Sequence, residues 1–377
     1  MRHPQLSVQT PGTLPRGAET TQTTPPVTPT KSDAKDTRDI LRYTDDAQIH
    51  RDSHDQAVEF GRGAWSTVYK ASSVPKPSTE VLTPPSSPAT SSGRIVAIKV
   101  PTRRDAYPVL ETEAHILTRL VRAAGAEHHI VSFWGIIPRS HALVMDAVPA
   151  TLSGYIEEQA ERVKGQHDTK TLFEPVLGLQ GWLGLCRALV RGLNWLHGNS
   201  IVHGDLKPHN ILLRRVCDTT DGNNDFPYTP LFADFSSAHE LSASPAAVAT
   251  NTMTALTPPF TAPELLVISS LKSSDIAPTP ASDVFSLAVT LLAAATGDLL
   301  LYPGTNHMQR LAMAREGHRV VEFARSGMAG CRVRKDGVVE RVVAPAVVKL
   351  PEERVSTVEW VSMVDGMCEK VEVENRG

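Results

Sequence analysis

The chain has 377 residues, 41% hydrophobic and 21% charged, which is long enough for a substantial core with tails attached. Its net charge of -3 excludes a general electrostatic attraction to nucleic acid or anionic membranes, and no base-reading or zinc motif appears. The four cysteines are far apart without metal-ligand spacing, which indicates free thiols in a reducing, cytoplasmic or nuclear compartment.

Three segments are too polar to fold by themselves. Residues 1–50 are rich in Thr, Pro, Gln and Ser and contain no secretory signal, so we predict a disordered tail there. Residues 72–93 form a second Ser/Thr/Pro-rich stretch, which we expect to loop out between two strands. Residues 217–230 lengthen a later hairpin, at low cost because closure entropy grows slowly with loop length.

A glycine-rich turn follows the first tail. Residues 58–68 indicate a strand, a turn that contains Gly61 and Gly63, and a returning strand. Glycines at such a turn let backbone N–H groups approach a phosphate closely, although most such turns are plain hairpins.

Next come a strand over residues 95–99, which ends on Lys99, and a helix. One face of this helix carries the spacing i, i+3, i+4 and i+7, at Glu113, Ile116, Leu117 and Leu120. Glu113 is therefore our first choice for an acidic group facing the interior, and Glu111 is the reserve.

The middle of the chain supplies further strands and a long helix. Residues 130–137 and 142–147 are strand-like, and Met145 precedes a short connection through Asp146 and Val148. Residues 182–197 place leucines at helical spacing, which predicts a helix packed in a core.

The richest chemistry lies in residues 203–210, which read His-Gly-Asp-Leu-Lys-Pro-His-Asn. Asp205 can accept a proton, Lys207 can neutralise phosphate charge, and Asn210 can offer an oxygen to a metal ion. Asp234 adds an anionic ligand, and one Asp with one Asn is enough protein coordination for Mg²⁺. Phosphoryl transfer needs this combination of groups.

This ordered set, completed by Ala262-Pro263-Glu264 and Asp283, resembles the eukaryotic protein kinase family of the serine/threonine type. The resemblance implies an α+β, two-lobed fold, with a small lobe over residues 51–147 and a large helical lobe over residues 148–377. It also implies ATP and Mg²⁺ as cofactors and a protein as the substrate.

The resemblance assigns roles residue by residue. Asp205 would be the catalytic base, with Lys207 and Thr257 beside it, and Asn210 and Asp234 would hold the metal. In this family such a threonine bonds the catalytic aspartate and lysine, here Asp205 and Lys207. That bond and the presence of Lys207 favour serine/threonine over tyrosine as the acceptor. The nucleotide would be bound by Gly61, Arg62, Gly63, Ala64, Trp65, Ser66, Val68, Ala97, Lys99, Glu113, Met145, Asp146 and Val148.

The chain departs from the family pattern at four positions. Ser66 replaces the third glycine of the turn, and Ser236 replaces the glycine after Asp234-Phe235. Phe260 stands where many relatives have tyrosine. Gly204 replaces the arginine that normally binds an activation-loop phosphate, so we expect activity that does not depend on such a phosphate.

The apolar run at residues 284–301 is short for a membrane span and is better explained as the buried central helix of the large lobe. In the family, Asp283 caps this helix and holds the catalytic loop. His197 and His203 lack a third ligand at sensible spacing, so packing is favoured over metal binding.

The C-terminal part matches the pattern least. A short helix is expected over residues 308–316, whereas residues 319–348 have no clear counterpart. Arg376 resembles the late family arginine that pairs with Glu264, which would leave the large lobe shortened. A frayed, exposed terminus at Arg376 is the equal alternative.

Two functions are consistent with these motifs. The first is an active serine/threonine protein kinase. The second is a kinase-fold scaffold that has lost catalysis through its departures from the pattern. Intact Lys99, Asp205, Asn210 and Asp234 favour the first. The substrate, the pathway, the upstream regulation and the oligomeric state are not encoded in any motif.

Overall fold

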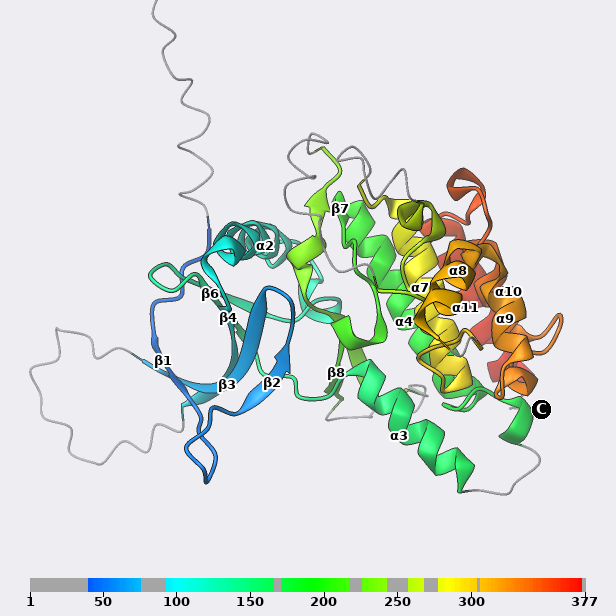
Figure 1. Cartoon of the computed structure of the whole chain (residues 1–377), viewed down its shortest axis with the longest axis horizontal. Helices are drawn as coiled ribbons and strands as arrows, with labels where there is room; N and C mark the ends of the chain where they lie inside the picture. The colour runs from blue at the N-terminus through cyan, green and yellow to red at the C-terminus, as the bar shows by residue number, and fades with distance from the viewer. Residues whose placement is uncertain are drawn as a thin grey trace, which may run out of the picture. The chain divides into compact units, whose positions relative to one another are not determined.

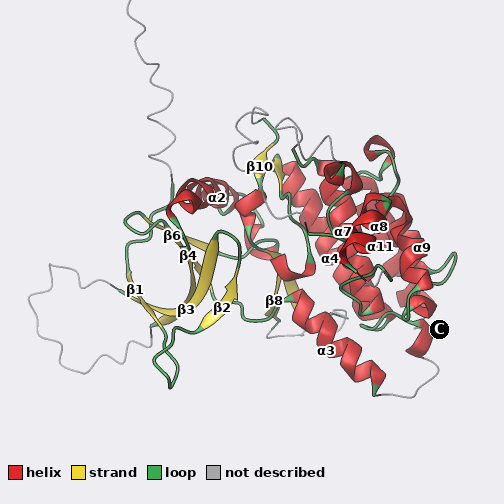
Figure 2. Cartoon of the chain, in the orientation of Figure 1, coloured by secondary structure: helices red, strands yellow, loops and turns green. Residues whose placement is uncertain are grey.

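In a computed structural model, the described residues are 40–75, 93–165, 171–216, 226–242, 257–267, 277–303 and 306–374. The chain divides into two units, Met1–Arg38 and Asp39–Gly377, and every element below belongs to the second. This unit has a β-rich small lobe and a helical large lobe (Figure 1; Figure 2), which is the α+β, two-lobed architecture expected from the sequence. Within the described ranges, no helix combines the length and apolar character that crossing a bilayer requires.

The small lobe is a six-stranded antiparallel sheet in the order β1-β3-β4-β6-β5, with β2 paired to β3. Its strands are β1 (Asp46–Ile49), β2 (Glu59–Arg62), β3 (Ser66–Val74), β4 (Arg94–Pro101), β5 (Phe133–Ile137) and β6 (Ala142–Asp146). Helix α2 (Tyr107–Leu120) has Pro108 in its first turn and packs its apolar face against β5. The predicted spacing therefore places Glu113 inside the lobe, where it is buried.

The folded region begins earlier than we predicted. We expected a tail through residue 50, but β1 pairs with β3, and Arg42 forms a bridge with Ile136. Tyr43 packs against the apolar cluster on the outer side of the sheet. A polar composition concealed this segment because its main attachment is a backbone ladder, which does not require apolar side chains. The rest of the predicted tail, residues 1–39, lies outside the described residues.

Other boundaries also shift toward longer strands. β3 continues to Val74, inside the predicted loop at 72–93, and residues 76–92 lie outside the described part of the chain. β9 (Tyr228–Phe232) begins inside the predicted insertion at 217–230, of which 217–225 are not described. Ile130 is not part of β5 and instead forms an isolated bridge with Phe232.

The large lobe is built around two long helices. Its helices are α3 (Leu152–Lys164), α4 (Leu179–Gly198), α7 (Pro280–Thr296), α8 (His307–Arg315), α9 (Val320–Ser326), α10 (Val338–Val343) and α11 (Thr357–Glu374). Its short strands are β7 (Ile201–Val202), β8 (Ile211–Arg215), β9 and β10 (His239–Glu240), paired as β7 with β10 and β8 with β9. Helix α7 is buried along nearly its whole length, which confirms a central core helix.

The start of α7 differs from the prediction. Thr279 is the N-cap, in a capping box with Ser282, and Gly297 ends the helix in the left-handed conformation. Asp283 is therefore not the cap. It lies one turn inside the helix, and its side chain is 1% exposed. Its carboxylate can therefore accept hydrogen bonds from the loop that contains Asp205.

The C-terminal region contains helices where the sequence showed no pattern. Helix α8 lies within one residue of the prediction, whereas α9 and α10 occupy the segment without a family counterpart. Helix α11 packs on α4, and its buried Trp360 donates from Nε1 to the carbonyl oxygen of Val342 at 2.9 Å.

Candidate active site

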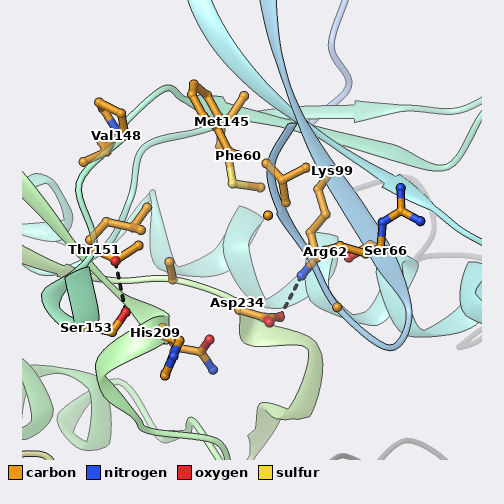
Figure 3. Close-up of a pocket in the computed structure, with 18 of the residues that line it drawn as sticks. Phe60, Arg62, Ser66, Lys99, Met145, Val148, Thr151, Ser153, His209 and Asp234 are labelled. Atoms are coloured by element: carbon orange, nitrogen blue, oxygen red, sulfur yellow. Dashed lines mark hydrogen bonds and ion pairs between the residues drawn. The ribbon is translucent and has the colours of Figure 1, made fainter. Parts of the chain in front are cut away.

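A cavity of about 610 Å³ lies between the sheet and the large lobe. Fifteen of the predicted site residues line it: Gly61, Arg62, Gly63, Ser66, Val68, Ala97, Lys99, Glu113, Met145, Asp146, Val148, Lys207, Asn210, Asp234 and Thr257. Figure 3 shows Lys99 extending across this space to Asp234, with Met145 and Val148 on one side and His209 on the other.

The glycine-rich turn forms one wall of the cavity. The N–H of Gly63 donates to the carbonyl oxygen of Ser66 at 2.8 Å, which closes the turn between β2 and β3. A Cβ on Gly61 would meet no protein atom within 4 Å, so this backbone leaves room for a close ligand. Arg62 reaches back to Glu59, with 2.6 Å between Nη2 and Oε1.

Two residues predicted for the nucleotide site do not line the cavity. Ala64 is exposed at the tip of the turn. The ring of Trp65 turns toward the guanidinium of Arg103, 4.9 Å from its centroid, and the carbonyl oxygen of Trp65 accepts from Thr102. Trp65 therefore anchors the turn from outside, because a large ring gains more from packing on the lobe than from occupying an open cavity.

Lys99 makes the central ionic contact. Its Nζ lies 2.8 and 2.7 Å from the two carboxylate oxygens of Glu113 and 2.7 Å from Oδ1 of Asp234. Burial alone would lower the pKa of Lys99, but Asp234 and Glu113 outweigh it and raise that pKa. The reserve candidate, Glu111, instead pairs with Nδ1 of His141 at 2.7 Å.

On the opposite side of the cavity, three polar side chains form one network around Asp205. Nζ of Lys207 lies 2.7 Å from Oδ2 of Asp205 and 3.2 Å from Oγ1 of Thr257. Nδ2 of Asn210 donates to the carbonyl oxygen of Asp205 at 2.8 Å and to Oδ2 at 3.0 Å. Asp205 does not line the cavity itself, and burial, partly offset by Lys207, raises its pKa to about 6.

The Asp205 loop is held from beneath by Asp283. Its Oδ2 accepts from the backbone N–H of His203 at 2.8 Å, and its Oδ1 accepts from that of Gly204 at 2.9 Å. Oδ2 also lies 3.1 Å from Nε2 of His197. His203 is fully buried against Phe235, so both histidines have structural contacts, as expected.

Gly204 is required by the backbone. Its φ is +79°, and a Cβ there would lie 2.7 Å from the carbonyl oxygen of Ser237. The residue that replaces the family arginine therefore occupies a conformation and a space that suit glycine alone.

Glu264 has a different partner from the one we proposed. Nη1 and Nη2 of Arg354 donate to its two carboxylate oxygens at 2.8 and 2.7 Å. Arg376 lies outside the described residues. Arg354 stands just before the helix-start signal Ser356-x-x-Glu359, in which Ser356 Oγ donates to Oε2 of Glu359 at 2.8 Å. Helix α11 follows Arg354, so the first of our two readings of Arg376, in which it pairs with Glu264 and the large lobe is shortened, is wrong.

Comparison with known proteins agrees with this arrangement. Residues 87–363 match the protein kinase domain family. The chain belongs to this family.

Two of its relatives are fungal proteins named serine/threonine-protein kinase ISR1. The one from Eremothecium gossypii is 30% identical over 217 residues, which cover 53% of this chain and 52% of that protein. The one from Saccharomyces cerevisiae is 30% identical over 175 residues, which cover 44% of this chain and 36% of that protein. Serine/threonine-protein kinase GRIK2 of Arabidopsis thaliana is 33% identical over 105 residues, 28% of this chain and 21% of that protein. The matches thus span about half of the first relative and less of the others.

The kinase cavity also has a lining that sequence reasoning missed: Phe60, Pro149, Thr151, Ser153, His209, Leu212 and Ala233. His209 and Ala233 are next to predicted residues in the chain and Leu212 is two positions after Asn210, so closeness in sequence to Asn210 and Asp234 was an available signal. Thr151 was detectable as a helix cap, since its Oγ1 accepts from the N–H of Gly154 at 3.1 Å. That hydroxyl also contacts the hydroxyl of Ser153, drawn as a dashed line in Figure 3, and the two oxygens lie 3.0 Å apart.

Asn210 and Asp234 fit a divalent cation in this kinase domain. Burial alone would raise the pKa of Asp234, but Lys99 outweighs it and holds that pKa well below its usual range, so the carboxylate is ionised. The amide nitrogen of Asn210 is committed to Asp205, which leaves its oxygen as a donor. These oxygens suit Mg²⁺, which takes few protein ligands. Among the described residues, no group of three or more His, Cys, Asp or Glu side chains forms an alternative metal cluster.

Proposed function

We propose that this chain is an ATP- and Mg²⁺-dependent protein serine/threonine kinase that transfers the γ-phosphate of ATP to a Ser or Thr hydroxyl. One observation carries the proposal: the Lys99–Glu113–Asp234 contacts and the Asp205–Lys207–Asn210 network flank a single cavity. Lys99 would then supply a cation for phosphates, and the buried Asp205 beside the cavity would supply a base for a hydroxyl.

On the nucleotide side, Lys99 would bind phosphate oxygens with its orientation fixed by Glu113. The open backbone around Gly61 and Gly63 would approach the same phosphates through N–H groups. Asn210 and Asp234 would hold Mg²⁺. When bound, the ion neutralises phosphate charge as it develops in the transition state.

On the acceptor side, Asp205 would align the substrate hydroxyl and accept its proton. Lys207 would stay beside this carboxylate and stabilise the transferred group. Thr257 fixes Lys207 from the segment that leads to Glu264, which favours a serine or threonine acceptor. The relatives named as serine/threonine kinases support this choice of acceptor.

The test is transfer from labelled ATP to generic protein substrates by the purified full chain with Mg²⁺. We expect wild-type transfer to Ser and Thr, and losses of about 100-fold or more in Lys99→Met and Asp205→Asn. Thr112→Val is the matched control, because the Thr112 hydroxyl bonds the Pro108 carbonyl of its own helix.

Phosphate on tyrosine would contradict the acceptor assignment. A folded protein that binds neither ATP nor Mg²⁺-ATP would contradict the whole proposal and favour a scaffold. Wild-type turnover in Asp205→Asn would remove Asp205 as the base.

A further inference from the structure

A short segment before β1 crosses the small lobe and contacts α2. This segment, residues 40–43, we name the strap. Its Leu41 N–H donates to Oγ1 of Thr118 on α2 at 3.0 Å, and Thr118 is 4% exposed. The strap also pairs with β5, since Ile136 N–H donates to the Leu41 carbonyl and Tyr43 N–H donates to the Ile136 carbonyl, each at 2.9 Å.

The sheet is shaped to receive the strap at Gly135. This glycine has φ +134°, and a Cβ there would lie 2.5 Å from the Tyr43 nitrogen and 2.7 Å from the Arg42 carbonyl carbon. Real Cβ atoms do not approach backbone this closely, so any other residue would displace the strap. Ile40 packs against the main apolar core, which includes the buried face of α2.

The strap touches the helix that positions the nucleotide-binding lysine. Thr118 and Glu113 lie on the same helix, and five residues of α-helix span only about 7.5 Å. A rigid helix passes a shift at Thr118 to Glu113, and Glu113 places Nζ of Lys99. The strap is therefore two contacts away from the phosphate-binding group.

We propose that the strap positions α2, with Leu41 and Thr118 as positioning residues, so that the contact between Glu113 and Lys99 forms in the geometry required for transfer. This inference rests on the proposed kinase function. It assigns a role to residues that precede the region matched by the kinase family, residues 87–363.

The strap bond to Thr118 differs from two ion pairs that also attach α2 to its surroundings. The ion pairs Glu111–His141 and Arg119–Glu240 are partly exposed, and such pairs contribute only about 0–1 kcal/mol. The hydroxyl of Thr118 is buried, so removing it leaves the Leu41 N–H without this partner inside the lobe.

Thr118→Val in the full chain tests the proposal. It keeps the side-chain shape and replaces the hydroxyl that accepts from Leu41 with a methyl group. We expect the KM for ATP to rise about fivefold, the KM for protein substrate to stay constant, and amide hydrogen exchange across α2 to accelerate about fivefold. Gly135→Val, which displaces the strap sterically, should give the same pattern. Thr112→Val on the same helix should change none of these quantities.

The variant Glu113→Gln distinguishes the proposed positioning role of the strap from a purely structural role. In that background the strap has no ion pair to position, so adding Thr118→Val should raise the KM for ATP less than twofold further. A further fivefold rise in the KM for ATP would overturn the proposal, as would unchanged α2 exchange in both strap variants. If wild type transfers no phosphate, the proposed function fails, while α2 exchange and the affinity for a fluorescent ATP analogue still decide the role of the strap.

Discussion

Arg354 binds both carboxylate oxygens of Glu264 across 90 residues of sequence, and its guanidinium also donates to the carbonyl oxygens of Ala281 and Val348. The Arg354 side chain is only 1% exposed. A buried, bidentate cation thus joins the segment after Thr257 to the first turn of α7.

Arg354→Met should destabilise the fold by about 2–3 kcal/mol, because it removes charged hydrogen bonds to a carboxylate that is itself 28% exposed, together with the bonds to two carbonyl oxygens. Urea unfolding of the full chain measures the change. Arg341→Met, which alters an exposed arginine on α10, is the control and should cost about 0.5 kcal/mol or less. A loss below about 1 kcal/mol in Arg354→Met would show that the pair is not a structural link.

The raised pKa of Asp205, about 6, predicts an acid limb in the activity profile. The base must be ionised, so kcat/KM should fall about tenfold per pH unit below about pH 6. The contribution of Asp205 to folding stability changes with pH in the opposite direction. The folded state binds the Asp205 proton more tightly than the unfolded state, so this group's contribution falls as pH rises from about 4 to about 6.

Initial rates between pH 4 and 8 at low substrate test the acid limb, with unfolding measured at the same pH values. In Asp205→Asn, the free energy of unfolding should no longer show the decrease with rising pH that the Asp205 carboxyl causes. If the acid limb of the wild-type protein lay near pH 4, the pKa of Asp205 would not be raised, and the assignment would be contradicted.

Substitutions of Asp234 and Asp205 should have different effects on nucleotide binding. Asp234→Asn removes the anionic ligand, so the gain in ATP affinity on adding Mg²⁺ should fall about tenfold or more. Asp205→Asn should leave that gain within about threefold while turnover is lost. Titration of a fluorescent ATP analogue with and without Mg²⁺ measures both. Equal effects of the two variants would refute the assignment of Asp234 to the metal.

Gly204 predicts activity without an activation-loop phosphate. Phosphatase treatment should change kcat less than twofold, as measured with treated and mock-treated protein. Gly204→Ala should lower rather than raise activity, since its Cβ would approach the Ser237 carbonyl in a left-handed conformation that costs about 1–3 kcal/mol. Gly366→Ala, at a helical glycine with no atom within 4 Å of the new Cβ, is the control.

Local patterns predicted the parts of the site that one element determines. Helical spacing selected Glu113 over Glu111, and residues 203–210 placed Asp205, Lys207 and Asn210 on one loop. What the sequence did not reveal are contacts between distant segments. The choice of Arg354 for Glu264 depends on how the segment before α11 meets the first turn of α7, and the orientation of Trp65 depends on Arg103 from beyond β4.

The strap was missed for a related reason. Its attachment consists largely of backbone hydrogen bonds and of one hydroxyl from α2, and these leave little trace in hydrophobic periodicity. Gly135, inside an apolar strand, was the available signal, because an isolated glycine there often marks a close backbone approach.

The order β1-β3-β4-β6-β5 has a practical consequence for making the protein. A fragment cut at residue 87, where the family match begins, would retain Lys99 and Glu113 but discard β1, β2 and β3. The inner strand β4 would then become an open edge, carrying unpaired N–H and C=O groups beside the apolar run Ile95-Val96-Ala97-Ile98. Such an edge pairs readily with copies of itself, so expression from residue 87 should yield aggregates, whereas a start at or before residue 40 preserves the covered sheet.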